Sequence, residues 1–203
     1  MIRYHLAAVP LVAATATLCL AQDGPTFDCA KAESSAEKLI CEDPALAALD
    51  RRLAEVFEAA VAVTSGLDVG AQTATDELRA YQRGWIKGRD ECWKETDLRS
   101  CIETEYLRRE GELVAEWMLE EPASVTTYLC GQGPADELII YLFPNELPGI
   151  RVERGDSIGV GAQTSVNTPD TYYLRQMGSV TLNGPEALWE DAYGKATTCT
   201  AQG

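Results

Sequence analysis

Three stretches of the chain carry apolar residues at the three- and four-residue spacing of an amphipathic helix. The stripes consist of Leu46, Leu49, Leu53, Val56 and Ala60, of Leu78, Tyr81, Trp85 and Cys92, and of Ile102, Tyr106, Leu113 and Trp117. The second and third stripes predict helices that begin near Asp76 and at Cys101, the last one ending before Pro122. Because large apolar side chains at this spacing usually form a core, we expect a helical bundle.

Helix start signals support this pattern in the first part of the chain. Ser34 and Glu37 have the spacing of a capping box, in which each side chain binds the backbone N–H of the other residue. Asp43 can cap a second helix, and the fixed φ of Pro44 suits its first position. We therefore expect a short helix over 34–41 and a longer one that begins at Pro44.

The segment between the second and third stripes is polar. Cys92 and Cys101 flank residues 93–97, which cannot continue an apolar stripe. This arrangement predicts the turn of a helical hairpin that a disulfide staples at its corner.

After residues 120–124, the helical period gives way to the alternation that is typical of strands with one buried face. Strands are expected over 128–130, 138–143, 150–153, 171–177, 179–182 and 187–189. The fold class is therefore α+β in two segregated domains, with a stapled helical bundle over 22–121 and a small antiparallel β-barrel or β-sandwich over 126–203.

Residues 1–21 have the pattern of a secretory signal peptide. A basic start precedes the apolar run 6–20, and cleavage is expected before Gln22. Lipidation of Cys19 is the alternative, although Leu18 stands where lipoprotein processing prefers a small residue. No other apolar run approaches the ~18 residues that cross a bilayer. We expect an exported protein, periplasmic or secreted, without a membrane span.

Loss of the signal peptide would leave six of the seven cysteines, which are Cys29, Cys41, Cys92, Cys101, Cys130 and Cys199. An even number of cysteines in an exported chain indicates a disulfide framework, and six allow 15 connectivities. We prefer sequential pairing because it keeps each bridge inside one type of segment. Each short loop would then stabilise the fold by roughly 3 kcal/mol, and the long loop by roughly 4 kcal/mol.

The chain is strongly acidic, with 17 basic and 32 acidic residues. Cleavage also removes Arg3, which leaves 16 basic and 32 acidic residues and a net charge of −16. This charge repels phosphate backbones, so nucleic acid is not an expected partner, while it speeds encounter with a basic protein. The alternative is that the charge serves solubility alone.

The residue types present exclude most catalytic chemistry. His5 is the only histidine and leaves with the signal peptide, so neither a Ser-His-Asp relay nor the usual catalytic zinc site can form. Bridged cysteines offer no thiolate. No calcium loop occurs, and Gly155–Gly159 lacks the lysine of a phosphate-binding loop. We expect a protein without cofactor, metal or enzymatic activity, although a carboxylate-dependent glycan hydrolase stays as a minor alternative.

The helical half resembles the LprI-type lysozyme-inhibitor domain. The resemblance depends on Phe27-Asp28-Cys29-Ala30-Lys31-Ala32, Glu37, Ile40-Cys41, Leu46, Leu49-Asp50, Gln82, Trp85, Arg89-Asp90, Cys92, Cys101 and Tyr106. We expect Arg89 to pair with Asp50 or Asp90 and Trp85 to lie in the core. The alternative for Arg89 is contact with a partner protein.

The β half resembles the MliC family, the membrane-bound inhibitors of C-type lysozyme. The resemblance is carried by Tyr128-Leu129-Cys130, the run 138–143, Tyr172, Glu186-Ala187-Leu188 and Cys199. It implies that a serine of a Ser-Gly loop and a lysine before the Glu-Ala-Leu strand enter the lysozyme cleft. In this chain the loop 165–170 lacks Ser-Gly, and Asn183 stands near the lysine position. The candidate partner-binding residues are Ser165, Asn167, Thr168, Tyr172 and Asn183.

Both resemblances imply an exported inhibitor that binds a lysozyme, a basic protein, and blocks its active site without catalysis. The acidic charge of the chain agrees with a basic partner. The alternative is a non-inhibitory envelope module that binds another protein or a cell-wall component, which the uncharged Asn183 favours.

Overall fold

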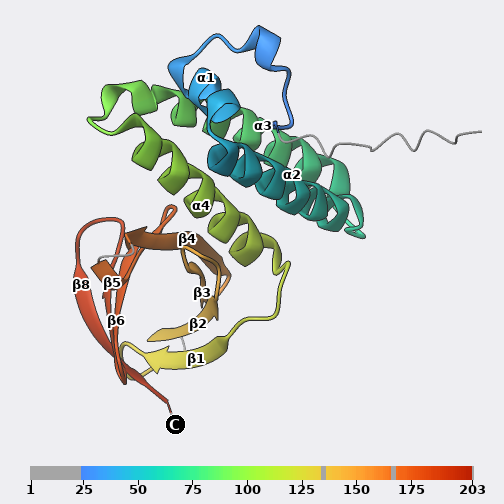
Figure 1. Cartoon of the computed structure of the whole chain (residues 1–203). Helices are drawn as coiled ribbons and strands as arrows, with labels where there is room; N and C mark the ends of the chain where they lie inside the picture. Colours follow the sequence, from blue (N-terminus) through green and yellow to red (C-terminus); the bar gives the residue numbers. More distant parts are fainter. Residues whose placement is uncertain (1–23, 134–135, 166–167, 203) are drawn as a thin grey trace, which may run out of the picture.

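The computed structural model describes residues 24–133, 136–165 and 168–202. Four α-helices come first and an eight-stranded antiparallel β-barrel follows, as Figure 1 shows. The expected α+β arrangement is thereby confirmed, and the barrel alternative is the correct one. The predicted signal peptide over 1–21 lies outside the described residues.

The helical elements are η1 (Cys29–Lys31), α1 (Ser35–Glu42), α2 (Pro44–Ser65), α3 (Ala71–Asp90), η2 (Glu91–Lys94) and α4 (Leu98–Trp117). The strands are β1 (Ser124–Leu129), β2 (Glu137–Phe143), β3 (Gly149–Arg154), β4 (Ser157–Ser165), β5 (Thr168–Leu174), β6 (Gly178–Asn183), β7 (Glu186–Glu190) and β8 (Ala196–Ala201).

The predicted caps form at the first two helices. The Ser34 hydroxyl accepts a hydrogen bond from the Glu37 backbone N–H at 3.0 Å, and the Glu37 carboxylate accepts one from the Ser34 N–H at 3.1 Å. The pKa of Glu37 is lowered because its carboxylate accepts hydrogen bonds from the backbone N–H groups of Glu33 and Ser34. Asp43 caps α2 ahead of Pro44. The capping box and the Asp-Pro start are confirmed.

Two predicted helix starts were placed too late. Helix α3 begins at Ala71 rather than near Asp76, because Gly70 turns the chain with a left-handed φ of 77° ahead of the apolar stripe. Helix α4 begins at Leu98 rather than Cys101, because the Asp97 side chain accepts a hydrogen bond from the third helical N–H.

A closed barrel forms in which each strand pairs with its neighbour in the sequence and β1 pairs with β8. Its core consists of Tyr128, Leu138, Ile140, Ile150, Val152, Tyr172, Leu174, Val180, Ala187, Trp189 and Cys199. A disulfide between Cys130 and Cys199 ties the end of β1 to β8. The other disulfides join Cys29 to Cys41 and Cys92 to Cys101, which is the sequential scheme.

The sequence analysis missed strands β4 and β8. In β4 the inward positions are Gly159 and Gly161, opposite Val152 and Ile150, while the apolar residues Ile158, Val160 and Ala162 alternate on the outer face, so the segment reads as glycine-rich. A Cβ at Gly161 would lie 1.8 Å from the backbone oxygen of Tyr173, which explains why this position takes glycine. The strand expected over 171–177 ends at Leu174, since a turn follows it.

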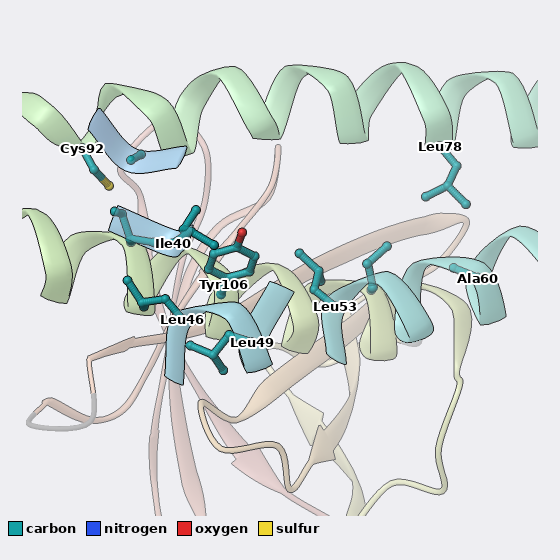
Figure 2. Packing of buried hydrophobic residues seen from close by; sticks show 11 residues of the cluster. Ile40, Leu46, Leu49, Leu53, Ala60, Leu78, Cys92 and Tyr106 are labelled. Atoms are coloured by element: carbon teal, nitrogen blue, oxygen red, sulfur yellow. The ribbon is translucent and has the colours of Figure 1, made fainter. Parts of the chain in front are cut away.

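Helix α4 forms the centre of the helical core. Tyr106 of α4 lies among Ile40, Leu46, Leu49 and Leu53, as Figure 2 shows. The apolar stripe of α4 therefore packs on α1 and α2, in the helical core that the sequence predicts.

The same helix also packs against the barrel, along β2, β3 and β4 (Figure 1). Gly111 meets Gly149 so closely that a Cβ on Gly149 would lie 2.5 Å from the Gly111 oxygen. Beside this contact, Val114 and Ala115 pack on Phe143. Because both flanks of α4 are buried, this helix belongs to two cores at once.

Charged side chains surround the contact between α4 and the barrel. Arg151 donates to the backbone oxygen of Glu116 at 3.0 Å. Arg175 lies 3.6 Å from Glu112 and 3.4 Å from Glu116. Arg52 of α2 reaches across to Glu146 at 3.1 Å. These contacts connect the two halves through α2 and α4.

None of the helices in the described ranges is long and apolar enough to span a membrane.

The Gly111–Gly149 contact predicts the effect of a single methyl group. Gly149→Ala should destabilise the protein by about 1–3 kcal/mol, because the added Cβ overlaps the backbone of α4. Urea unfolding would measure this change. Gly88→Ala is the control: a Cβ there meets nothing within 4 Å, and alanine should stabilise α3 by up to about 1 kcal/mol. Equal midpoints for the wild type and Gly149→Ala would contradict the close packing.

Candidate functional site

A buried polar network lies at the centre of the helical half. The Tyr106 hydroxyl donates to Asp50 Oδ1 at 2.8 Å and accepts from Arg89 Nη1 at 2.8 Å. Asp50 Oδ2 accepts from both the backbone and the hydroxyl of Thr26, at 2.7 and 2.6 Å. Arg89 donates from Nε and Nη2 to Asp90. The expected pairing of Arg89 with Asp90 is confirmed, while Asp50 is reached through Tyr106.

Burial controls the protonation of this network. It raises the pKa of Tyr106 well above its ordinary value, although the Arg89 charge opposes the shift. Burial by itself would lower the pKa of the Arg89 guanidinium. The interactions with Tyr106 and Asp90 outweigh burial, so the pKa is raised. Trp85 packs edge-on against Tyr106, with ring centroids 5.3 Å apart, and Arg89 lies 5.6 Å from the centre of the Trp85 ring. These groups connect helices α2, α3 and α4 in the core.

The corner between α3 and α4 presents a different kind of surface. The Cys92–Cys101 disulfide fixes it, and η2 carries the chain around the turn. Trp93 projects there with 61 % of its surface exposed. The acidic residues around it on the turn are Glu91, Glu95 and Asp97. We call residues 91–97 the stapled corner. It combines an exposed aromatic ring with carboxylates on a rigid turn.

The partner-binding candidates from the barrel lie on two hairpins. Ser165 pairs with Thr168 between β4 and β5, and Asn183 pairs with Glu186 between β6 and β7. In an up-and-down barrel these two hairpins lie at the same end. Asn183 is exposed there, whereas Asn167 and the side chains of Ser165 and Thr168 lie outside the described residues.

Tyr172 is not available at this end of the barrel. It is buried in the barrel core, and burial raises the pKa of its hydroxyl, as does the charge of Asp170. Its candidacy for partner contact stays a prediction that this burial does not favour. Its position on β5, paired with Val180, turns the side chain inward.

The barrel end carries no cation. None of the residues in 144–148, 165–168 and 183–186 is lysine or arginine. A neutral Asn183 cannot replace a cation that faces carboxylates, so this end lacks the chemistry that the MliC resemblance implies.

Sequence reasoning missed the cluster at the junction of α3, α4 and the barrel. Glu112 lies 3.5 Å from Arg109 and 3.6 Å from Arg175. Burial raises the pKa of Glu112 against the pull of these two charges, and burial lowers the pKa of Arg109. The Arg175 guanidinium stacks 4.1 Å from the Tyr81 ring centre. No local signal could have revealed a cluster drawn from three separate elements.

No group of three or more His, Cys, Asp and Glu side chains in the described part of the chain is arranged to hold a metal ion.

Comparison with known proteins bears on the helical half. Residues 29–113 match the family model described as "Lysozyme inhibitor LprI", and this range runs from η1 into α4. The helical half is similar to the LprI lysozyme inhibitors. The predicted LprI resemblance is confirmed. The MliC resemblance of 126–203 stays a prediction.

Curated relatives agree with the family match. Lipoprotein LprI of Mycobacterium bovis (strain ATCC BAA-935 / AF2122/97) is 31% identical over 111 residues, which is 53% of this chain and 50% of the relative. Lipoprotein LprI of two Mycobacterium tuberculosis strains, CDC 1551 and H37Rv, gives the same values. The chain thus spans about half the length of the curated relatives that it matches. No solved structure matches it.

The central network predicts the effect of removing one oxygen atom. Tyr106→Phe should destabilise the protein by about 1–3 kcal/mol, because it leaves Asp50 Oδ1 and Arg89 Nη1 without their partner in a buried site. Urea unfolding followed by tryptophan fluorescence measures the change. The matched control is Tyr193→Phe, at a tyrosine that is 97 % exposed, where a change under about 0.5 kcal/mol is expected. Equal losses in both variants would contradict the role of the network.

Proposed function

We propose that this chain is an exported lysozyme inhibitor, which covers the active-site cleft of a lysozyme and catalyses nothing itself. The observation that carries the proposal is the LprI match, which covers the stapled helical half from Cys29 to Leu113. The name of the relatives, Lipoprotein LprI, supports a place in the bacterial envelope or outside the cell.

Charge supports the encounter with such a partner. Residues 24–121 contain 22 acidic and 12 basic side chains, so the helical half alone carries a net charge of −10. Lysozymes of the C type are basic, and opposite charges on two partners accelerate association while adding less to affinity. The acidic helical half is therefore the half that we propose to make the contact.

The stapled corner is the part of this half best suited to enter a cleft. Exposed tryptophans are enriched among the residues that dominate protein–protein binding energy. The disulfide already restricts the backbone of the corner, so binding would order little additional chain. Lys94 lies 5.4 Å from the Trp93 ring centre and helps to hold the ring. We propose that Trp93 and the carboxylates beside it contact the lysozyme.

A second candidate function follows from the barrel end. Without a cation among its hairpins, the barrel lacks the lysine expected of an MliC-type inhibitor. This observation favours a chain that binds a different envelope component and does not inhibit lysozyme. Recovery of a periplasmic protein other than lysozyme, together with no inhibition, would support it.

The proposed function predicts salt-dependent inhibition. The purified chain should inhibit a C-type lysozyme in a cell-wall lysis assay at micromolar concentration or below. Raising the ionic strength from about 0.01 M to about 1 M shortens the Debye length from about 30 Å to about 3 Å, so inhibition should weaken at least tenfold. Absence of inhibition at low salt would exclude the proposal.

The stapled corner yields a separate prediction. Trp93→Ala should weaken inhibition at least tenfold, because it removes the aromatic anchor of the contact. Its unfolding free energy should change by less than about 0.5 kcal/mol, since the ring is largely exposed. Tyr193→Ala, an exposed aromatic on the barrel, is the matched control and should inhibit like the wild type. Full inhibition by Trp93→Ala would place the contact elsewhere.

A further inference from the structure

Two adjoining hollows lie where α3, α4 and the barrel meet. The first has a volume of about 750 Å³ and is lined by Glu77, Ala80, Tyr81, Gly84, Trp85 and Glu112. The second has a volume of about 450 Å³ and is lined by Arg108, Glu112, Ala162, Thr164 and Tyr173. Glu112 borders both. We call the two together the junction groove. Neither domain forms it alone.

The walls of the junction groove are aromatic and largely accessible. Tyr173 of β5 is 72 % exposed and Tyr81 of α3 is 47 % exposed. Arg175 and Arg109 lie 4.1 and 5.3 Å from the Tyr81 ring centre, so this ring is held in place before any ligand arrives. Aromatic rings with a polar tip bind ligands that present both C–H faces and hydroxyl groups.

The polar groups of the groove can serve both donors and acceptors. The carboxylates of Glu77 and Glu112 accept hydrogen bonds, and the guanidinium of Arg108 donates them. The indole Nε1 of Trp85 is buried, so Trp85 contributes the face and edge of its ring to the first hollow and no accessible donor.

Charge in the groove favours a neutral ligand. The carboxylates of Glu77 and Glu112 oppose an anion. The guanidinium groups of Arg108, Arg109 and Arg175 oppose a cation, and two of them already face Glu112. A neutral ligand rich in hydroxyl or amide groups is repelled neither by the carboxylates nor by the guanidinium groups.

Gly84 keeps the first hollow open. A Cβ there would meet nothing within 4 Å, so internal packing does not require glycine at this position. Glycine in an exposed helix costs about 1 kcal/mol relative to alanine. What glycine provides at 84 is space at the wall of the hollow. Gly88 is equally unobstructed but does not border the groove.

A rival hollow at the far end of the barrel lacks these features. It includes Trp189 and Tyr193. Arg154 covers the Trp189 ring at 4.5 Å, and the Trp189 indole N–H donates to the Met177 backbone oxygen at 3.1 Å. Its tryptophan nitrogen is therefore already paired, while its ring is covered by a guanidinium as the Tyr81 ring is.

We propose that the junction groove binds a neutral oligosaccharide, with one sugar ring against Tyr173 and a neighbouring ring in the hollow of Tyr81 and Trp85. This binding site goes beyond lysozyme inhibition and does not depend on it.

The test is a titration of the purified full chain with two neutral trisaccharides, chitotriose and maltotriose, by calorimetry or NMR. Both sugars should bind in the millimolar range or tighter, since the aromatic walls and the polar groups of the groove do not distinguish them. Each hollow has one variant with a matched control. Tyr173→Ala is compared with Tyr193→Ala, and Gly84→Leu is compared with Gly88→Leu.

The groove variants should each lose at least tenfold in affinity, which corresponds to about 1.4 kcal/mol, while the controls stay within about twofold of the wild type. No binding of either sugar at about 10 mM, or equal losses in variants and controls, would overturn the proposal. If sugars fail to bind while Gly84→Leu weakens lysozyme inhibition, the groove is a protein contact and the saccharide site is wrong. Inhibition by the wild type, measured alongside, reports separately on the proposed function.

Discussion

The packing of both flanks of α4 is the constraint on which the rest of the structure depends. One flank places Tyr106 in the helical core, and the other brings Gly111 against Gly149 and Val114 against Phe143 of the barrel. A helix with two buried flanks fixes the position of one domain relative to the other, since rotation about its axis would expose one of them. The short backbone approach at the two glycines makes that contact specific, because no side chain can take their place.

Two kinds of polar structure in the helical half have separate tasks. The buried chain of hydrogen bonds from Asp50 through Tyr106 to Arg89 is satisfied internally, and so it specifies the packing of the helices. The stapled corner has the opposite character, since Trp93 is exposed beside acidic side chains. The disulfide at Cys92 connects the two, as it anchors the exposed turn to the core. The buried network and the proposed partner contact are thereby separated along one hairpin.

Much of the fold could be predicted because its signals are local. The capping residues Ser34 and Asp43 and the apolar stripes act within one or two helical turns, and the structure confirms them except at Tyr81, which is half-exposed in the junction groove. Strand β4 gave a weaker signal, since glycines at 159 and 161 occupy its inward positions, its alternating apolar residues lie on the outer face, and β3 supplies the apolar neighbours inside the barrel. The burial of Tyr172 was missed for a related reason: the strand's register, not its composition, decides which face is inside.

The sequence by itself determined most of the element types, the six cysteines beyond residue 21 and the acidic charge. Only the tertiary structure decided that Asp50 reaches Arg89 through a tyrosine on another helix. It alone brought Tyr81, Glu112 and Tyr173 to one groove. The physical reason is the separation of the interacting residues along the chain. Caps and stripes depend on residues within a few positions of one another, whereas these contacts join distant segments and exist only because α4 is buried on two sides.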